Sequence, residues 1–397
     1  MACSLLNRRA PPATVTVTTT VVQLLVACLA VSTFTSDSVT SAEGISSRDS
    51  TPLPAFSWKT VPAFFHSSYL NSLTFPESAM KIITKFPIVT IEKWQGCKAS
   101  DYTYEDDAML AAAKQIKTAN PEINVNVWFD SFRIYSNKSL NPSAIDNANQ
   151  FCIRSRHSEF LESHVDYLLR NTSGDLAIES YCHLHVYDYV KPYVQEYWTQ
   201  MCLNMTKSGY VDGCGCDGSQ SRAADSGSVQ VPHIAADYAI KWNAAKIDMM
   251  NTTRSALNGG LLLGKEPFEI GTYIDAILHE GCAANNQTIL MLRNISALSK
   301  DLGRPLIVEC HFSGVNENEV AAFLIGAGQY HYFGAGGWNG ASFDSHWDDK
   351  LLGSTLGDPA TDAVYDVESQ VWARKFASGT SVAFNAKTKK GTIAWSG

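Results

Sequence analysis

Five acidic residues each come directly after an apolar run of the chain. Charged side chains are seldom buried unless they are paired, so acids at the ends of apolar runs indicate a shared functional surface. If the runs are parallel strands of one barrel, their carboxyl ends meet at one mouth and all five side chains project into it. The five acids are Glu92, Asp130, Asp217, Glu280 and Glu309.

Several carboxylates around one sugar-sized mouth predict hydrolysis of a glycosidic bond. In that reaction one carboxylate attacks the sugar or activates water, and a second acid protonates the leaving oxygen. Asp217 follows the run 211–216 and is the candidate nucleophile or base. Glu280 and Glu309 are both candidate proton donors, and three apolar residues lead directly into Glu309.

Further residues near the same predicted strand ends are candidates for binding a substrate. Aromatic faces suit sugar rings, and imidazole or carboxylate groups can bond to hydroxyls. The candidates are Glu92, Trp94, Trp128, Asp130, His66, Tyr332 and Trp338.

A structural interpretation competes with each of these assignments. Asp217 can cap a turn, and Glu280 can cap a helix or pair with a base. Glu92, which Lys93 follows, can form a salt bridge at the rim, and Asp130 can position a loop. About half of the aromatic rings are expected to pack the barrel rim instead of binding sugar.

The elements that must position these residues alternate between strand and helix. Apolar runs separated by helical patterns are typical of a parallel sheet. Eight such strands in about 280 residues predict an α/β fold, a (β/α)8 TIM barrel. The predicted strands are 63–66, 87–92, 123–129, 211–216, 260–264, 273–279, 306–309 and 329–333. The predicted helices are 77–85, 104–120, 187–207, 235–257, 288–302 and 317–326.

Two segments extend this pattern. Residues 145–169 contain a helical stretch and residues 167–175 indicate a small hairpin, which together form an insertion on a barrel loop. The tail 370–395 alternates apolar and polar residues and predicts two or three antiparallel strands. The predicted divisions are a signal peptide (1–42), a Ser/Thr/Pro-rich spacer (43–56), the barrel domain (57–365) and a small C-terminal antiparallel β appendage (366–397).

The N-terminal segment has the pattern of a cleaved signal peptide. Arg8 and Arg9 precede the apolar run 21–31, and small residues follow it. The run is shorter than the roughly 20 residues that a membrane span requires, which disfavours a retained anchor. We therefore expect secretion, or retention in the secretory pathway or cell wall, without stable membrane insertion. N-linked glycans are expected at the sequons Asn137, Asn171, Asn204, Asn251, Asn286 and Asn294.

The cysteines also indicate an oxidising compartment. Cys3 and Cys28 lie in the leader, and the remaining eight of the 10 form an even set that favours disulfides. Cys214 and Cys216 point to the same face of a strand. Each is therefore expected to pair elsewhere or to remain a buried thiol.

Other function classes are disfavoured. The 397-residue chain has a net charge of -8 and no basic stripe, so no nucleic-acid partner is expected. The pair Cys214 and Cys216 lacks the ligand spacing of a zinc site, and no metal is expected. No nucleophile elbow, P-loop or dinucleotide-binding glycine motif is present, and no cofactor is expected.

Five short segments together resemble a family of secreted glycoside-hydrolase-like (β/α)8 proteins. They are residues 87–94 (PIVTIEKW), 210–218, 277–281 (ILHEG), 323–334 and 372–376 (WARKF). The resemblance spans most of the mature chain, and it implies an eight-stranded barrel with a β appendage and a sugar-active role. In related barrel hydrolases an Asp ending the fourth strand often serves as nucleophile, which corresponds to Asp217. A later acid, Glu280 or Glu309, is then the proton donor. The Cys-Gly-Cys before Asp217 departs from the simple apolar run usual there.

The leading hypothesis is a secreted glycosidase that acts on a poly- or oligosaccharide. The alternative is a non-catalytic carbohydrate-binding or extracellular-matrix glycoprotein on the same scaffold, since fold does not fix function. Two acids within about 5 to 10 Å across one mouth favour the enzyme. Acids held apart, or locked by Arg and Lys, favour the binding protein. A lyase is disfavoured because few Arg residues follow the predicted strands.

Overall fold

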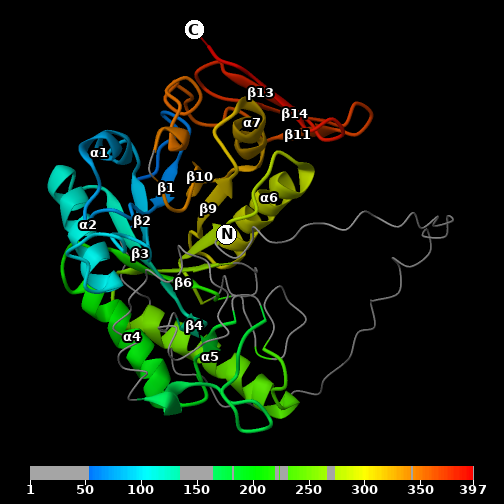
Figure 1. The fold of residues 1–397 in the computed structure, drawn as a ribbon. Helices are drawn as coiled ribbons and strands as arrows, with labels where there is room; N and C mark the ends of the chain where they lie inside the picture. Colours follow the sequence, from blue (N-terminus) through cyan, green and yellow to red (C-terminus); the bar gives the residue numbers. More distant parts are fainter. Residues whose placement is uncertain are drawn as a thin grey trace, which may run out of the picture.

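The computed structural model describes residues 53–134, 164–180, 183–219, 223, 231–265, 273–340 and 343–396 (Figure 1). The predicted signal peptide and residues 43–52 of the spacer lie outside the described residues. Most of the helical stretch predicted at 145–169 also lies outside them. Among the described helices, none has the length and apolar character needed to cross a membrane.

Eight parallel strands form the barrel, as predicted. Neighbours pair in the order β1, β2, β3, β6, β7, β8, β9, β10, and a bridge between Ala63 and Phe333 joins the last strand to the first. Their bounds are β1 (Phe64–Ser67), β2 (Ile88–Glu92), β3 (Asn124–Asp130), β6 (Gly213–Asp217), β7 (Leu261–Lys265), β8 (Ala276–His279), β9 (Ile307–Phe312) and β10 (His331–Ala335).

The unusual Gly-Cys-Gly-Cys sequence of β6 follows from the packing on its two sides. Its glycines face the barrel interior, where a Cβ on Gly215 would lie 1.9 Å from the ring of Trp128. Its cysteines face the outer core, where Cys214 forms a disulfide with Cys202. The strand thus leaves room for an indole inside the barrel and is fastened from outside.

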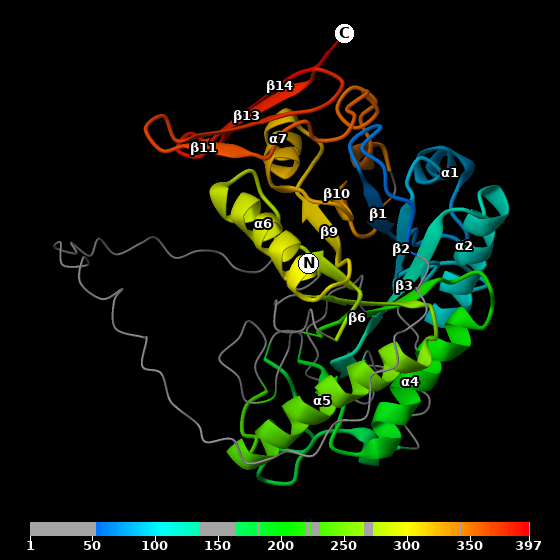
Figure 2. The same cartoon turned by 180° about the vertical axis from the view of Figure 1, so that it is seen from behind.

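Six described helices cover the outside of the barrel (Figures 1 and 2). Apolar residues on one side of each are buried, for example Ala112 and Ile116 of α2 and Leu292 of α6. Only residues 266–275 connect β7 to β8, and the described part of that connection is not helical. The helices are α1 (Glu77–Ile83), α2 (Glu105–Ala119), α4 (Pro192–Thr206), α5 (Ala236–Ala256), α6 (Asn286–Asp301) and α7 (Glu317–Gly326).

Within the described part of the chain, two disulfides connect a barrel strand to a neighbouring segment. Cys202 of α4 bonds to Cys214 of β6, and Cys282, beyond β8, bonds to Cys310 of β9. Cys216 is a free, buried thiol. The expectation that Cys214 and Cys216 do not pair with each other is therefore confirmed.

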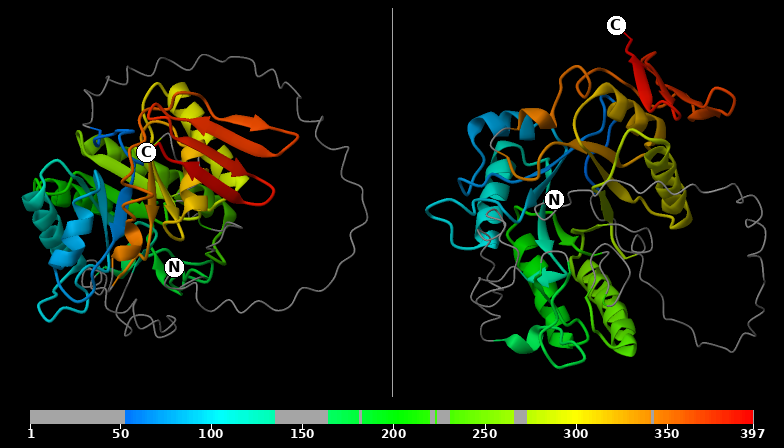
Figure 3. Two further views of the ribbon diagram at one scale, coloured as in Figure 1. Left: turned by 90° about the horizontal axis from the view of Figure 1, so that it is seen from above. Right: turned by 45° about the vertical axis from the view of Figure 1, so that its right-hand side comes forward.

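The C-terminal tail forms a four-stranded antiparallel sheet instead of the two or three strands predicted. The additional strand begins before the predicted tail. The sheet lies over α7 (Figure 3), where the backbone N–H of Gly391 donates to Asn318 Oδ1 at 2.9 Å. Its strands are β11 (Val364–Asp366), β12 (Val371–Lys375), β13 (Ser381–Asn385) and β14 (Lys390–Ala394).

A small insertion follows β3. The short strands β4 (Arg133–Ile134) and β5 (His185–Val186) pair antiparallel, and the 3-10 turn η2 spans Val165–Tyr167. An antiparallel bridge between Arg170 and Leu176 lies at the predicted hairpin.

Candidate active site

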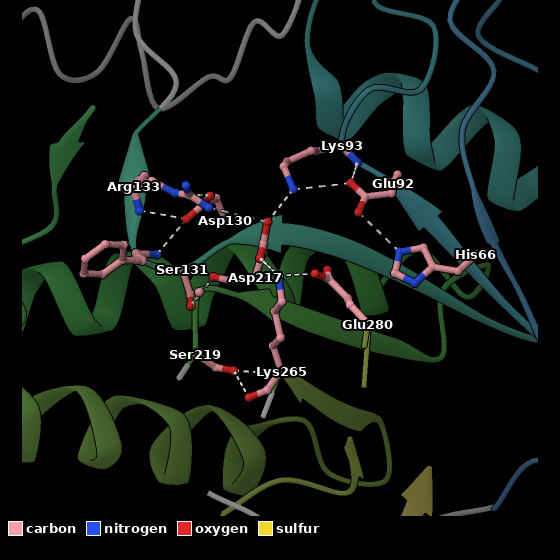
Figure 4. A network of polar contacts seen from close by, with 12 residues as sticks. His66, Glu92, Lys93, Asp130, Ser131, Arg133, Asp217, Ser219, Lys265 and Glu280 are labelled. Carbon is pink, nitrogen blue, oxygen red and sulfur yellow. Dashed lines mark hydrogen bonds and ion pairs between the residues drawn. The ribbon is translucent and has the colours of Figure 1, made fainter. Parts of the chain in front are cut away.

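Asp217 lies at the centre of a charged network in the barrel mouth (Figure 4). The ammonium of Lys93 lies 2.7 Å from Asp217 Oδ2 and 3.3 Å from Glu92 Oε2. The ammonium of Lys265 lies 3.6 Å from Asp217 Oδ1 and 2.5 Å from Glu280 Oε2. Each lysine therefore bridges Asp217 to a second predicted acid.

The shared lysine sets an upper limit on the separation of two candidate acids. Because Asp217 and Glu280 have oxygens 3.6 and 2.5 Å from the same Lys265 nitrogen, those oxygens are at most about 6 Å apart. Carboxyl groups are about 5 to 5.5 Å apart in retaining glycosidases and roughly 6.5 to 9.5 Å apart in inverting ones. The pair is thus close enough for the chemistry of a glycosidase.

The environment of Asp217 favours its ionised form. Burial alone would raise the pKa of this carboxyl, but Lys93, Lys265 and Arg133 outweigh burial and hold the pKa well below its usual range. The backbone is fixed as well, because Ser131 donates from both N and Oγ to the Asp217 carbonyl at 2.8 Å. Asp217 is therefore an anchored carboxylate.

Asp130 ends β3, and its carboxylate accepts hydrogen bonds from residues two and three positions later in the chain. Its Oδ1 accepts hydrogen bonds from the backbone N–H groups of Phe132 and Arg133, at 2.9 and 2.7 Å. Its Oδ2 accepts from Arg133 Nε at 3.1 Å. These bonds shape the loop and aim the guanidinium, whose Nη2 lies 4.0 Å from Asp217 Oδ2.

Glu92 and Glu309 lie on either side of a buried histidine. His66 Nε2 lies 3.4 Å from Glu92 Oε1, and His66 Nδ1 lies 4.0 Å from Glu309 Oε2. Burial would raise the pKa of Glu92, but Lys93 and then His66 outweigh it and lower the pKa. Burial raises the pKa of Glu309 to about 7, against smaller opposing effects of His66 and Thr90.

The structure corrects the predicted position of Glu309. The predicted strand stops at Glu309, whereas β9 continues to Phe312, so this side chain lies inside the barrel and not at a strand tip. It is 0% exposed and accepts a hydrogen bond from Thr90 Oγ1 at 3.2 Å. Glu280, by contrast, follows the end of β8 and its side chain is 29% exposed.

Three of the four predicted aromatic residues lie close to the acids, and the fourth does not. Trp94, Trp128 and Trp338 lie among the site residues: Lys93 Nζ is 4.7 Å from the Trp94 ring centre, and the His66 ring contacts Trp128 and Trp338. Trp128 is 0% exposed, whereas Trp94 and Trp338 are 6% and 7% exposed.

Tyr332 is not part of the mouth, contrary to the prediction. It lies near the start of β10, and its hydroxyl donates to the carbonyl of Ala55 at 3.2 Å. Its ring contacts Phe56, in the segment that leads into β1. It therefore packs inside the barrel at the level of Glu309, its partner in the strand register, and below the strand tips that carry Asp217 and Glu280.

Several buried polar atoms around the acids have no hydrogen-bond partner within the described protein. Two are donors, the indole Nε1 atoms of Trp94 and Trp128, and others are the acceptor Asp217 Oδ1 and the imidazole His311 Nε2. Donors and acceptors gathered in this way match the hydroxyls of a carbohydrate, which both donate and accept.

Buried Lys246 supports the site from below. Its ammonium donates to the carbonyl of Gly218, the residue after Asp217, and lies 5.1 Å from the Phe132 ring centre. Burial is the main reason that its pKa is lowered to about 7. Lys246 thus holds the turn that follows the central carboxylate.

Sequence reasoning missed most of the cations. Lys265 and Arg133 were not candidates, and Lys93 entered only as a neighbour of Glu92. A signal was present for the two lysines, because Lys93 follows Glu92 directly and Lys265 directly follows the predicted strand 260–264. Arg133 begins the short strand β4, which the sequence analysis did not predict, and no sequence pattern indicated the direction of its side chain.

The fold and the mouth define a glycosidase-like (β/α)8 barrel. The model of the hypothetical glycosyl hydrolase family 15 matches residues 117–380. The chain belongs to this family, which places it among the glycoside hydrolases. A search of the curated proteins finds no match.

Solved structures with similar folds include three carbohydrate-active proteins. A noncanonic maltogenic alpha-amylase AmyB from Thermotoga neapolitana has 12% identity and a TM-score of 0.47, over 82% of this chain and 86% of that chain. The glycoside hydrolase domain of PelA from Pseudomonas aeruginosa has 12% identity and a TM-score of 0.39, over 66% and 87%. The alpha-galactosidase AgaA from Geobacillus stearothermophilus has 11% identity and a TM-score of 0.48, over 84% and 48%. With identities of 11 to 12% and TM-scores below 0.5, these likenesses carry no argument about this chain.

Proposed function

We propose that the protein is a secreted glycosidase that acts on a poly- or oligosaccharide with retention of anomeric configuration. Asp217 is the nucleophile and Glu280 is the general acid and base. The observation that carries this proposal is that one lysine contacts both carboxylates, which keeps their oxygens within about 6 Å of each other.

The roles follow from charge and access. Asp217 has a depressed pKa, so it is ionised and can attack the anomeric carbon as the glycosidic bond breaks. Glu280 is the more exposed of the two carboxylates and gives its proton to the leaving oxygen. It then takes a proton from the water that hydrolyses the glycosyl-enzyme, which releases the sugar and restores both groups.

This mechanism requires Lys265 to move. Its ammonium lies between the two carboxylates where the scissile bond must enter, and its side chain is 21% exposed. Lys93 is 1% exposed and stays in place beneath Asp217. We therefore assign Lys265 to the displaceable side of the mouth and Lys93 to its fixed floor.

Glu309 is the weaker candidate for proton donor. Its raised pKa, about 7, suits a general acid, but the side chain is fully buried below the mouth. Contact with a leaving oxygen comes before proton affinity in choosing a general acid. Glu309 is better placed to interact with His66, which in turn contacts Glu92.

A non-catalytic carbohydrate-binding protein is the second candidate. The ion pairs favour it, because Asp217, Glu92 and Glu280 each contact a lysine. In that case the unpartnered indole and imidazole groups bind sugar hydroxyls and no bond is broken.

Secretion and N-linked glycosylation remain part of the proposal. The structure contains the disulfides Cys202–Cys214 and Cys282–Cys310. Disulfides form and persist in oxidising compartments such as the secretory pathway. Three of the sequon residues, Asn204, Asn251 and Asn294, are exposed on helices. A mass shift on enzymatic deglycosylation of the secreted protein would test this part.

A panel of glycans tests the enzyme against the binding protein. Wild type, Asp217→Asn and the control Asp212→Asn are compared for hydrolysis and for binding. Asp212 lies just before β6 at the other end of the barrel and pairs with Lys117, so its substitution should preserve turnover. Loss of a nucleophile typically lowers kcat by more than about a thousandfold.

The outcomes separate the two functions. Hydrolysis by wild type and the control, with the retained anomer formed first in a proton NMR time course, supports the proposal. Binding without hydrolysis of any glycan by wild type supports the second candidate. Full activity of Asp217→Asn removes Asp217 from the mechanism.

A further inference from the structure

A concave site lies at the end of the barrel where β9 and β10 begin, opposite the strand ends that carry Asp217 and Glu280. It is a cavity of about 620 Å³, lined by residues that precede β9 and β10, by one side of α6 and by the C-terminal sheet. Figure 2 shows α6 and α7 beside that sheet. The volume falls within the range of about 300 to 1,000 Å³ that is usual for small-molecule sites.

The charge of this cavity is opposite to that of the chain. Four cationic side chains line it, Arg293, Lys300, Arg304 and Arg374, against the single carboxylate of Asp362. The whole chain has a net charge of -8. Cations gathered in a concave surface of an acidic protein produce a local field that attracts anions.

Two of the four cations have structural partners that account for them. Arg374 donates from Nη1 to the carbonyls of Leu324 and Ala327, at 2.8 and 2.7 Å, and so covers the C-terminal end of α7. Arg304 Nη1 lies 3.7 Å from Asp275 Oδ1. These contacts offset the negative end of a helix and one carboxylate.

The positive charges of the other two cations are not neutralised by ion pairs among the described residues. Arg293 and Lys300 are exposed on α6, and neither has a carboxylate within ion-pair distance among the described residues. Lys300 is in the last turn of α6, where the helix dipole favours a cation. Arg293 is two turns earlier, beyond the reach of that effect.

Arg293 is nevertheless held in place. Its guanidinium lies 5.3 Å from the ring centre of Trp372, and the indole Nε1 of Trp372 donates to Asn286 Oδ1 at 2.8 Å. The planar guanidinium is therefore positioned by β12, and a positioned guanidinium binds carboxylate, sulfate or phosphate groups with two parallel hydrogen bonds.

We infer that this cavity is a binding site for an oxyanion-bearing ligand, distinct from the glycosidase mouth. Arg293 and Lys300 supply the free charge, and Arg304 and Arg374 form the wall that they face. The same chemistry recognises the carboxylate or sulfate groups of an acidic glycan and free inorganic phosphate. The inference does not depend on the proposed hydrolysis, because no residue of the mouth takes part.

Isothermal titration calorimetry of the full chain tests the site. The ligands are a sulfated oligosaccharide, an oligogalacturonate, inorganic phosphate and a neutral oligosaccharide of the same length. The test variant is Arg293→Ser with Lys300→Ser, and the control is Lys387→Ser with Lys389→Ser, which removes the same charge from the turn after β13. All four side chains are exposed, so equal unfolding midpoints verify that the variants fold.

The expected result is binding of oxyanions by wild type and the control, weakened about tenfold or more in the test variant. The binding should also weaken as salt rises from about 20 to 500 mM, since exposed charges are screened. Binding of phosphate alone supports the site and assigns it to a small anion, whereas binding of the acidic oligosaccharides assigns it to glycans. Failure of every oxyanion to bind wild type overturns the inference, as do equal binding of the neutral ligand and equal losses in the two variants.

Discussion

Lys93 is expected to be the largest electrostatic contributor to stability in the barrel mouth. Its side chain is 1% exposed and lies 2.7 Å from Asp217 and 3.3 Å from Glu92. Lys93→Met keeps the aliphatic stem and removes the charge, so two buried carboxylates lose the cation between them. Removing one partner of a buried pair costs about 3 to 5 kcal/mol of unfolding free energy. We expect a loss in that range near pH 7.

The loss should depend on pH in a defined direction. Asp217 and Glu92 have folded pKa values below the usual ones, so their stabilisation is complete above their unfolded values, near 4, and is lost as the pH falls through the folded values. Lys93→Met removes the largest cause that lowers each pKa, so both pKa values rise relative to wild type and the carboxyls take up protons at higher pH. The difference in stability between wild type and variant should therefore be greatest near neutral pH and shrink as the pH falls.

Urea denaturation at several pH values measures this difference. Lys265→Met is the matched control, because its side chain is 21% exposed and solvent screens its ion pairs. Fully exposed pairs contribute about 0 to 1 kcal/mol, so the cost of Lys265→Met should lie between that range and the cost of Lys93→Met. The reasoning is refuted if Lys93→Met costs no more than Lys265→Met, or if its cost is the same at pH 4 and pH 7.

Two further predictions concern the acid and the disulfide behind the site. Glu309→Gln should be more stable than wild type at pH 8 by about 3 to 3.5 kcal/mol and equal to it at pH 4, because burial raises the folded pKa from 4.5 to about 7 and ionisation costs stability as the pH rises between these values. Urea denaturation at the two pH values checks this, and equal stabilities at pH 8 would contradict it. Cys202→Ser with Cys214→Ser opens a loop with a sequence separation of 12 and should lower the unfolding free energy by about 3 kcal/mol. Denaturant unfolding under non-reducing conditions measures this loss. An unchanged unfolding midpoint would contradict the prediction.

The fold was predictable because buried parallel strands are apolar on both faces. Each of the eight predicted strands overlaps its observed counterpart, and Asp217 and Glu92 end their strands as the pattern indicated. Strand ends were less predictable where polar residues are buried. Glu309 and His311 are polar but interior, so the composition of β9 gave no sign that the strand continues to Phe312.

The acidic residues of the site were predicted from the sequence, but its cationic residues were not. An acid after an apolar run was taken as a sign of function, and the same rule applied to bases would have selected Lys93 and Lys265. Tyr332 shows a different limit of prediction from sequence. Its place near β10 was correct, but alternation along a strand does not say at which end of a barrel an inward side chain lies.

The two disulfides couple the assembly of the mouth to its oxidation state. Cys214 lies three residues before Asp217, and Cys282 lies two residues after Glu280, so each carboxylate is carried by a segment with its own covalent tie. A newly made chain with reduced thiols has neither tie. Covalent constraint of the segments that carry Asp217 and Glu280 therefore requires oxidation of these thiols, and recombinant protein made in a reducing cytoplasm would lack both constraints however well its barrel folds.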